Sequence, residues 1–232
     1  MDDDEHYEQW CEEFKYLGGR VNLLHTRVQM WEAIDGELVR MQRPGSGFVV
    51  AVFRPIVGEA QGVLVRRLLD KDKRTHSLVR LVGQMAKHHT VLTRTRFVDQ
   101  WQEDLVEEAN QAFDALAGRP GRDYLPRGPL LQLRDAIAAA GAEIQESVSQ
   151  MVAHDQIEPT AQPFTWGQLE RAINGLSVQY VNVGKILKGG YYEPVPILPP
   201  EWREAFKDGF FGPGAPRYET RHLIDRDDVD AG

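Results

Sequence analysis

Cysteine is nearly absent from this sequence of 232 residues, since Cys11 is the only one. A single thiol excludes an intrachain disulfide framework and a zinc site built on several thiolates, and it fits a reducing compartment. No run of about 18 apolar residues occurs, so we expect no membrane-spanning segment. The chain starts with acidic residues instead of the basic and apolar start of a signal peptide. We therefore expect a cytoplasmic protein.

The sequence also lacks the short motifs of common enzyme and cofactor sites. It has no glycine-rich phosphate-binding loop, no His-Glu-x-x-His motif and no Gly-x-Ser-x-Gly motif. His88 and His89 are adjacent, so on a helix they would point about 100° apart and could not easily share a metal ion. We therefore predict neither a metal site nor a cofactor.

Apolar residues recur at steps of three and four along most of the chain, and this spacing predicts helices. Pro55 either interrupts the second helix or marks its true start near Arg54. The third helix is capped by Thr75 or Ser77. Thr165 and Gln168 match the capping box expected at the start of the sixth helix. The expected helices cover about residues 7–43, with a kink at Gly18–Gly19, then 48–69, 77–92, 97–116, 130–151 and 165–187.

The predicted fold is therefore all-α, an up-and-down bundle of about five or six helices within residues 1–190. The remaining residues, 191–232, form a Pro- and Gly-rich C-terminal extension, because six of the thirteen prolines lie between Pro194 and Pro216. Prolines at this density prevent a long helix. The extension is expected to be dispensable for folding of the bundle.

Two segments carry a resemblance to a known family. Residues 68–78, Leu-Leu-Asp-Lys-Asp-Lys-Arg-Thr-His-Ser-Leu, resemble the helix–loop–helix signature of HEPN domains of the AbiU type, which are linked to bacterial abortive infection. Residues 152–155, Val-Ala-His-Asp, resemble the Ala-His element of the same family. The resemblance covers about residues 5–190. It implies a helical bundle that is often dimeric and, in active members, metal-independent cleavage of RNA by an Arg followed after four to six residues by a His.

The Arg of that pair is missing here. The corresponding positions before His154 are residues 147–149, which are Ser, Val and Ser. The nearest upstream arginine, Arg134, would lie about 30 Å away along a helix. His154 is therefore a candidate catalytic residue without its usual phosphate-binding partner. Its alternative role is to interact as an imidazolium with the C-terminal end of its helix.

The same Arg–His spacing occurs at two other places, Arg20 with His25 and Arg217 with His222. Chance alone predicts about that many matches in a chain of this composition. Arg20 and His25 also straddle the apolar stripe of the first helix, so we expect a flanking pair at the bundle surface.

Positive charge is concentrated in one segment of a chain whose net charge is −8. Residues 54–96 hold ten bases and three acids, a surplus of seven positive charges, whereas residues 1–13 hold seven acids and no Lys or Arg. Such a segment is either a polyanion-binding site or a solvated helix face balanced by acidic neighbours. Six of its bases lie around one expected helix–loop–helix corner and are the candidate RNA-binding residues: Arg66, Arg67, Lys71, Lys73, Arg74 and Arg80.

Three functions follow from these observations. The leading hypothesis is an HEPN-like protein of bacterial defence or toxin–antitoxin type that binds RNA or a partner without cleaving RNA. The alternatives are an active metal-independent ribonuclease whose Arg comes from elsewhere, and a structural helical interaction protein. The predicted partners are RNA, a second copy of the chain in a homodimer and another protein, with no membrane.

Overall fold

The computed structural model describes residues 2–41, 46–153 and 164–189, and most of them are helical. No β-strand occurs in these three ranges, where a single bridge pairs Thr93 with Tyr124. The predicted all-α fold is confirmed. The α-helices are α1 Asp3–Met41, α2 Ser46–Leu68, α3 Leu78–Lys87, α4 Arg94–Val98, α5 Val106–Ala117, α6 Arg127–Ala140, α7 Ala142–Ala153 and α8 Trp166–Lys188, with short 3₁₀ turns at His89–Val91 and Glu103–Leu105. None of the helices in the described part of the chain is long and apolar enough to cross a membrane.

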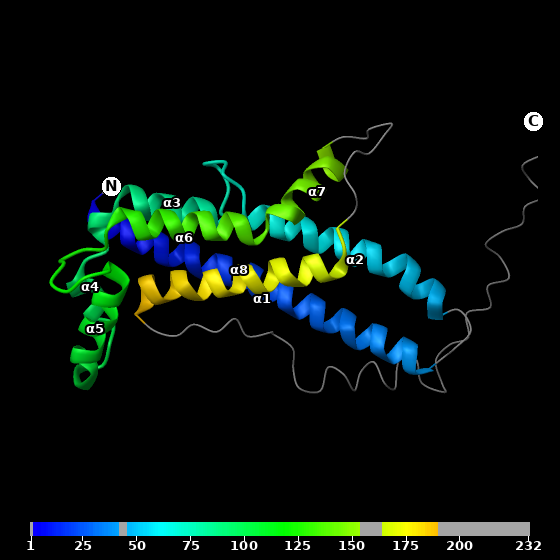
Figure 1. Cartoon of the computed structure of the whole chain (residues 1–232), viewed down its shortest axis with the longest axis horizontal. Coiled ribbons are helices and arrows are strands. Elements are labelled where there is room, and N and C mark those ends of the chain that lie inside the picture. The colour runs from blue at the N-terminus through cyan, green and yellow to red at the C-terminus, as the bar shows by residue number, and fades with distance from the viewer. Residues whose placement is uncertain (1, 42–45, 154–163, 190–232) are drawn as a thin grey trace, which may run out of the picture. The chain divides into compact units, whose positions relative to one another are not determined.

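The long helices form a bundle in which the chain reverses direction three times (Figure 1). It runs outward along α1, returns along α2 and α3, runs outward again along α6 and α7, and returns along α8. α1 packs against α2, α3 and α8, while α6 packs against α3 and α8, and α7 against α2. α4 and α5 pack against each other at one end of the bundle.

The core lies between these helices and is almost entirely apolar. Trp10, Phe14 and Leu17 of α1 are buried in this core, and the ring of Phe14 stacks on that of Tyr180 of α8 with centroids 4.4 Å apart. The amphipathic spacing of the sequence thus places its apolar residues on the buried faces. Trp10 and Trp31 are both buried core residues.

α1 continues without interruption through Gly18 and Gly19. The absence of a side chain at Gly18 has a packing reason, because a Cβ there would overlap the hydroxyl group of Tyr180 on α8. A Cβ at Gly19 would meet nothing within 4 Å. The first glycine therefore permits the close approach of two helices, while the second has no such role.

Two expected helices are each divided in the structure. The prediction of one helix over 97–116 is wrong, because α4 ends at Val98 and α5 begins at Val106. The chain bends between them, and Trp101 packs against the C-terminal end of α8 at Gly189. One helix over 130–151 is also wrong, because α6 and α7 meet at Gly141.

The predicted helix boundaries at capping residues are confirmed. Ser77 caps α3 by accepting a hydrogen bond from the Arg80 amide, and Thr165 and Gln168 form the capping box of α8. α8 ends at Gly189, which adopts the left-handed conformation that favours glycine. Pro55 does not mark the start of α2, which begins at Ser46 and contains the proline. His154 and the extension at 191–232 lie outside the described residues.

Candidate functional site

The loop between α2 and α3 is held in shape by its own aspartates. Asp70 accepts a hydrogen bond from the amide of Asp72, and Asp72 in turn accepts one from the amide of Arg74, both at 2.9 Å. Ser77 donates its hydroxyl to the carbonyl of Asp70 and so ties the end of the loop to its beginning. These local hydrogen bonds stabilise a projecting turn between the two helices. Asp and Ser side chains commonly form such bonds to the backbone of turns. Lys71 and Lys73 lie exposed within that turn.

A buried ion pair lies below the loop. The Nη1 atom of Arg80, in the first turn of α3, donates to both carboxylate oxygens of Glu13 on α1, at 2.6 and 2.9 Å. The Glu13 side chain is 4% exposed and that of Arg80 19%. Both charges have therefore lost most of their water, and each is compensated mainly by the other.

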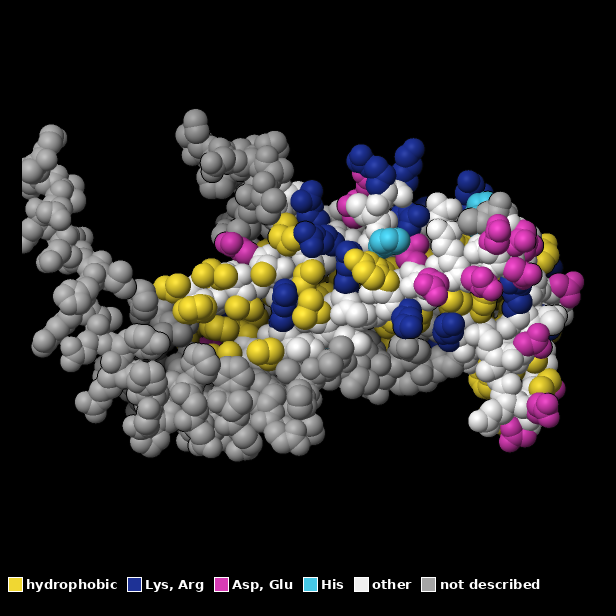
Figure 2. All heavy atoms as spheres, turned by 180° about the vertical axis from the view of Figure 1, so that it is seen from behind, with side chains coloured by type: hydrophobic (Ala, Val, Ile, Leu, Met, Phe, Trp, Pro, Cys, Tyr) yellow, Lys and Arg dark blue, Asp and Glu magenta, His cyan; other side chains and the backbone are white. Residues whose placement is uncertain are grey.

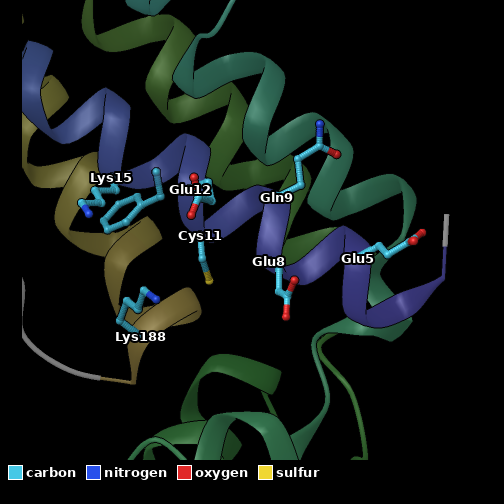
Figure 3. A pocket seen from close by; sticks show the side chains of 8 residues that line it. Glu5, Glu8, Gln9, Cys11, Glu12, Lys15 and Lys188 are labelled. Atoms are coloured by element: carbon cyan, nitrogen blue, oxygen red, sulfur yellow. The ribbon is translucent and has the colours of Figure 1, made fainter.

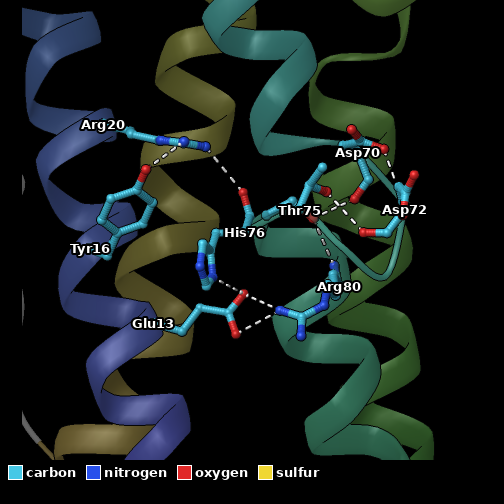
Figure 4. A network of polar contacts seen from close by, with 9 residues as sticks. Glu13, Tyr16, Arg20, Asp70, Asp72, Thr75, His76 and Arg80 are labelled. Atoms are coloured by element: carbon cyan, nitrogen blue, oxygen red, sulfur yellow. Dashed lines mark hydrogen bonds and ion pairs between the residues drawn. The ribbon is translucent and has the colours of Figure 1, made fainter.

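His76 shares the carboxylate of Glu13 and joins it to two further polar groups (Figure 4). Its Nδ1 lies 3.3 Å from Glu13 Oε1, while 56% of its side chain is exposed. The ring of Tyr16 meets that of His76 edge-on at 5.2 Å. Arg20 stacks over Tyr16 at 4.7 Å and donates to the His76 carbonyl and to the Tyr16 hydroxyl. The result is an exposed imidazole next to a guanidinium and in contact with a buried carboxylate.

The six predicted RNA-binding residues differ in their exposure and in whether a carboxylate pairs with them. Arg67 in the last turn of α2 is exposed, as are Lys71 and Lys73, and these lysines have no carboxylate partner in the part of the chain that the structure describes. Arg74 is exposed but pairs with Asp72 at 2.6 Å, and its hydrogen bonds hold the pKa of that carboxyl below its ordinary value.

The two remaining predicted residues are partly buried. Arg66 belongs to the last turn of α2, and Arg80 is held by Glu13. Arg80 therefore does not project from the corner as an independent charge, which the sequence-based prediction had assumed.

A hollow of about 390 Å³ lies beside the loop, between α3 and α6. Lys71, Lys73 and Arg80 line it, and α6 adds Arg134, which the sequence prediction of the site had missed. Figure 2 shows Lys and Arg side chains on the loop that projects at the top of the view. The structure thus brings three of the six predicted residues together with one new cation.

The hollow beside the N-terminal half of α1 is larger but has the opposite charge. It measures about 730 Å³ and is lined by Glu5, Glu8 and Glu12 together with Lys15 and Lys188 (Figure 3). Three carboxylates repel a phosphate backbone, so this hollow does not suit a nucleic acid. Among the described residues, no group of three or more His, Cys, Asp and Glu side chains is arranged to hold a metal ion.

The other candidate histidines each contact another group of the protein. His25 lies half-buried with its Nε2 2.5 Å from the Ser177 hydroxyl of α8, and burial lowers its pKa below the ordinary value. It does not meet Arg20, whose hydrogen bonds go to Tyr16 and to the loop before α3. His88 stacks with His6, and Nδ1 of His89 bonds to the Leu125 carbonyl.

Comparison with known proteins identifies no relative of this chain. No family model, no curated protein and no solved structure matches the chain.

Proposed function

We propose that this chain is an HEPN-like module of a bacterial defence or toxin–antitoxin system that binds RNA without cleaving it. The observation that carries the proposal is the pair Lys71 and Lys73, exposed on a projecting loop that Asp70, Asp72 and Ser77 keep in shape. A phosphate backbone gains most from cations that are neither buried nor already paired. The fixed loop presents both ammonium groups without a large cost of ordering the backbone.

Retention of labelled RNA on a filter tests the proposal. The double variant Lys71→Gln/Lys73→Gln should retain far less RNA than the unmodified chain at moderate salt. The matched control is Lys185→Gln/Lys188→Gln, which removes the same charge from exposed positions on α8. Equal loss in the two variants would mean that only net charge matters and would refute binding at the loop.

A second candidate function is metal-independent cleavage of RNA, and the contact of His76 with Glu13 favours it. A carboxylate can orient an imidazole for proton transfer near neutral pH, and a neighbouring guanidinium such as that of Arg20 can hold a phosphate. Incubation with RNA in EDTA separates the two functions. Cleavage that His76→Gln or His154→Ala abolishes would replace the non-cleaving proposal, whereas intact RNA supports it.

We further propose that the chain forms a homodimer through the outer face of α2. Val52, Phe53 and Ile56 are exposed on neighbouring turns of this helix. Arg54 lies between them in sequence, but its guanidinium is placed over the ring of Trp166, 5.8 Å from its centroid. An exposed apolar face can pack against its own copy around a two-fold axis.

A further inference from the structure

The hollow beside the loop lies where α3 packs against α6, and two small residues are among those that line it. Gly83 of α3 and Ala138 of α6 both line it. A Cβ on Gly83 would come no closer than 3.9 Å to Arg134 Cδ, so the glycine leaves space that a longer side chain would occupy. The space is thus part of the packing of α3 against α6, next to a loop fixed by its own hydrogen bonds.

The charges around this space do not cancel. Arg134 pairs with its neighbour Asp135 at 2.8 Å, and Arg80 is compensated by Glu13. Lys71 and Lys73 have no carboxylate partner in the described chain, so the hollow has an excess of about two positive charges.

We infer that this hollow binds a phosphomonoester, either the phosphorylated end of an RNA strand or a free nucleoside monophosphate. A phosphomonoester carries a charge of about −1.5 to −2 at neutral pH, whereas each internal phosphodiester of RNA carries a single negative charge. The excess of two positive charges matches the monoester. The volume of about 390 Å³ falls within the range of pockets for small ligands, so the space accommodates more than an isolated phosphate group.

This inference rests on the proposed function only for its RNA source, because a free nucleotide would fill the same site. It goes beyond general backbone binding, since it assigns a preference for strand ends. Lys71 and Lys73 contact the two terminal charges, and the Arg134 guanidinium, which has donors beyond those bonded to Asp135, contacts a further phosphate oxygen. Gln84, which also lines the hollow, offers an amide to the sugar or base.

Fluorescence anisotropy with one short oligoribonucleotide in three forms tests the inference: 5′-phosphorylated, 3′-phosphorylated and with both ends as hydroxyls. Adenosine monophosphate and inorganic phosphate are the competitors. At least one phosphorylated form should bind about tenfold more tightly than the unphosphorylated form, and adenosine monophosphate should compete. Gly83→Gln, which fills the hollow, should reduce that preference to less than about twofold. Gly19→Gln is the matched control, because its Cβ meets nothing, and should keep the preference.

The outcomes separate this inference from the proposed function. Binding of adenosine monophosphate without binding of any RNA would support the hollow as a nucleotide site and contradict RNA binding. Equal binding of all three RNA forms, without competition by the nucleotide, would overturn the inference and leave RNA binding intact. Binding of none of the probes would overturn both. A preference that persists in Gly83→Gln would place the phosphate elsewhere and also overturn it.

Discussion

Loss of either partner of the ion pair between Glu13 and Arg80 should strongly lower the free energy of unfolding, because the other charge would then be buried and unpaired. Glu13→Gln keeps the shape of the side chain but removes its charge, so Arg80 loses its only carboxylate partner within the described ranges. Removing one partner of a buried pair costs about 3–5 kcal/mol. Because water still reaches 19% of the Arg80 side chain, we expect the lower end, about 3 kcal/mol. For a chain of this size, the loss corresponds to a Tm lower by about 6–12 °C.

A double-mutant cycle isolates the pair from other effects of each substitution. The free energy of unfolding is measured in urea for the unmodified chain, Glu13→Gln, Arg80→Met and the double variant. Arg80 occupies the N-terminal turn of α3, where the helix dipole disfavours a cation, so the Met substitution also removes an unfavourable interaction. Each single substitution leaves the partner's charge buried and unpaired, whereas the double variant leaves neither charge, so it should lose at least about 1.5 kcal/mol less than the sum of the two single losses. Additivity within about 0.5 kcal/mol would refute the reasoning.

Three other predictions concern packing, pH and assembly. Gly18→Ala should destabilise the chain by about 1–3 kcal/mol in urea unfolding, because its methyl group would overlap the Tyr180 hydroxyl, whereas Gly19→Ala should stabilise it by up to about 1 kcal/mol. Burial lowers the pKa of His25, so its contribution is fully present above about pH 6.5, the unfolded pKa, and is lost as pH falls toward the folded pKa. Unfolding free energies between pH 7.5 and 5 should therefore fall less steeply for His25→Gln. Phe53 is 52% exposed and should pack at the interface of the proposed homodimer. The Phe53→Ser variant should therefore have the mass of a monomer in light scattering.

Each of these predictions has a direct control. For assembly, Val178→Ser on α8 alters an apolar residue that is 57% exposed, and it should leave the mass of the dimer unchanged. A monomeric unmodified chain at micromolar concentration would contradict the homodimer. Equal slopes with pH in the unmodified chain and His25→Gln would contradict the role of burial, and equal effects of the two glycine substitutions would contradict the packing argument.

Local patterns predicted which segments are helical, because the three-and-four spacing records which face is buried. Caps were predicted equally well, since Ser77, Thr165 and Gln168 act on backbone groups a few residues away. The breaks were missed where they depend on distant contacts. A Cβ at Gly141 would lie 2.5 Å from a methyl carbon of Leu69, so the junction of α6 and α7 reflects a close approach to the end of α2.

The candidate site was predictable to the same extent and for the same reason. The basic loop at 70–75 is a local feature and could be recognised in the sequence. The contact of Glu13 with Arg80 joins residues 67 positions apart, and Arg134 reaches the hollow from another helix. A count of charges treats all these residues as equal. The structure distinguishes Arg80, which Glu13 compensates, from Lys71 and Lys73, which have no carboxylate partner among the described residues.

The dependence of RNA affinity on salt tests the central claim most directly. Each contact with a phosphate of single-stranded RNA releases counterions and adds about 0.7 to the slope of log affinity against log salt concentration. If Lys71 and Lys73 each neutralise one phosphate charge, Lys71→Gln/Lys73→Gln should flatten that slope by about 1.4, while Lys185→Gln/Lys188→Gln should leave it unchanged. Unchanged affinity and slope in the loop variant would contradict RNA binding by this loop.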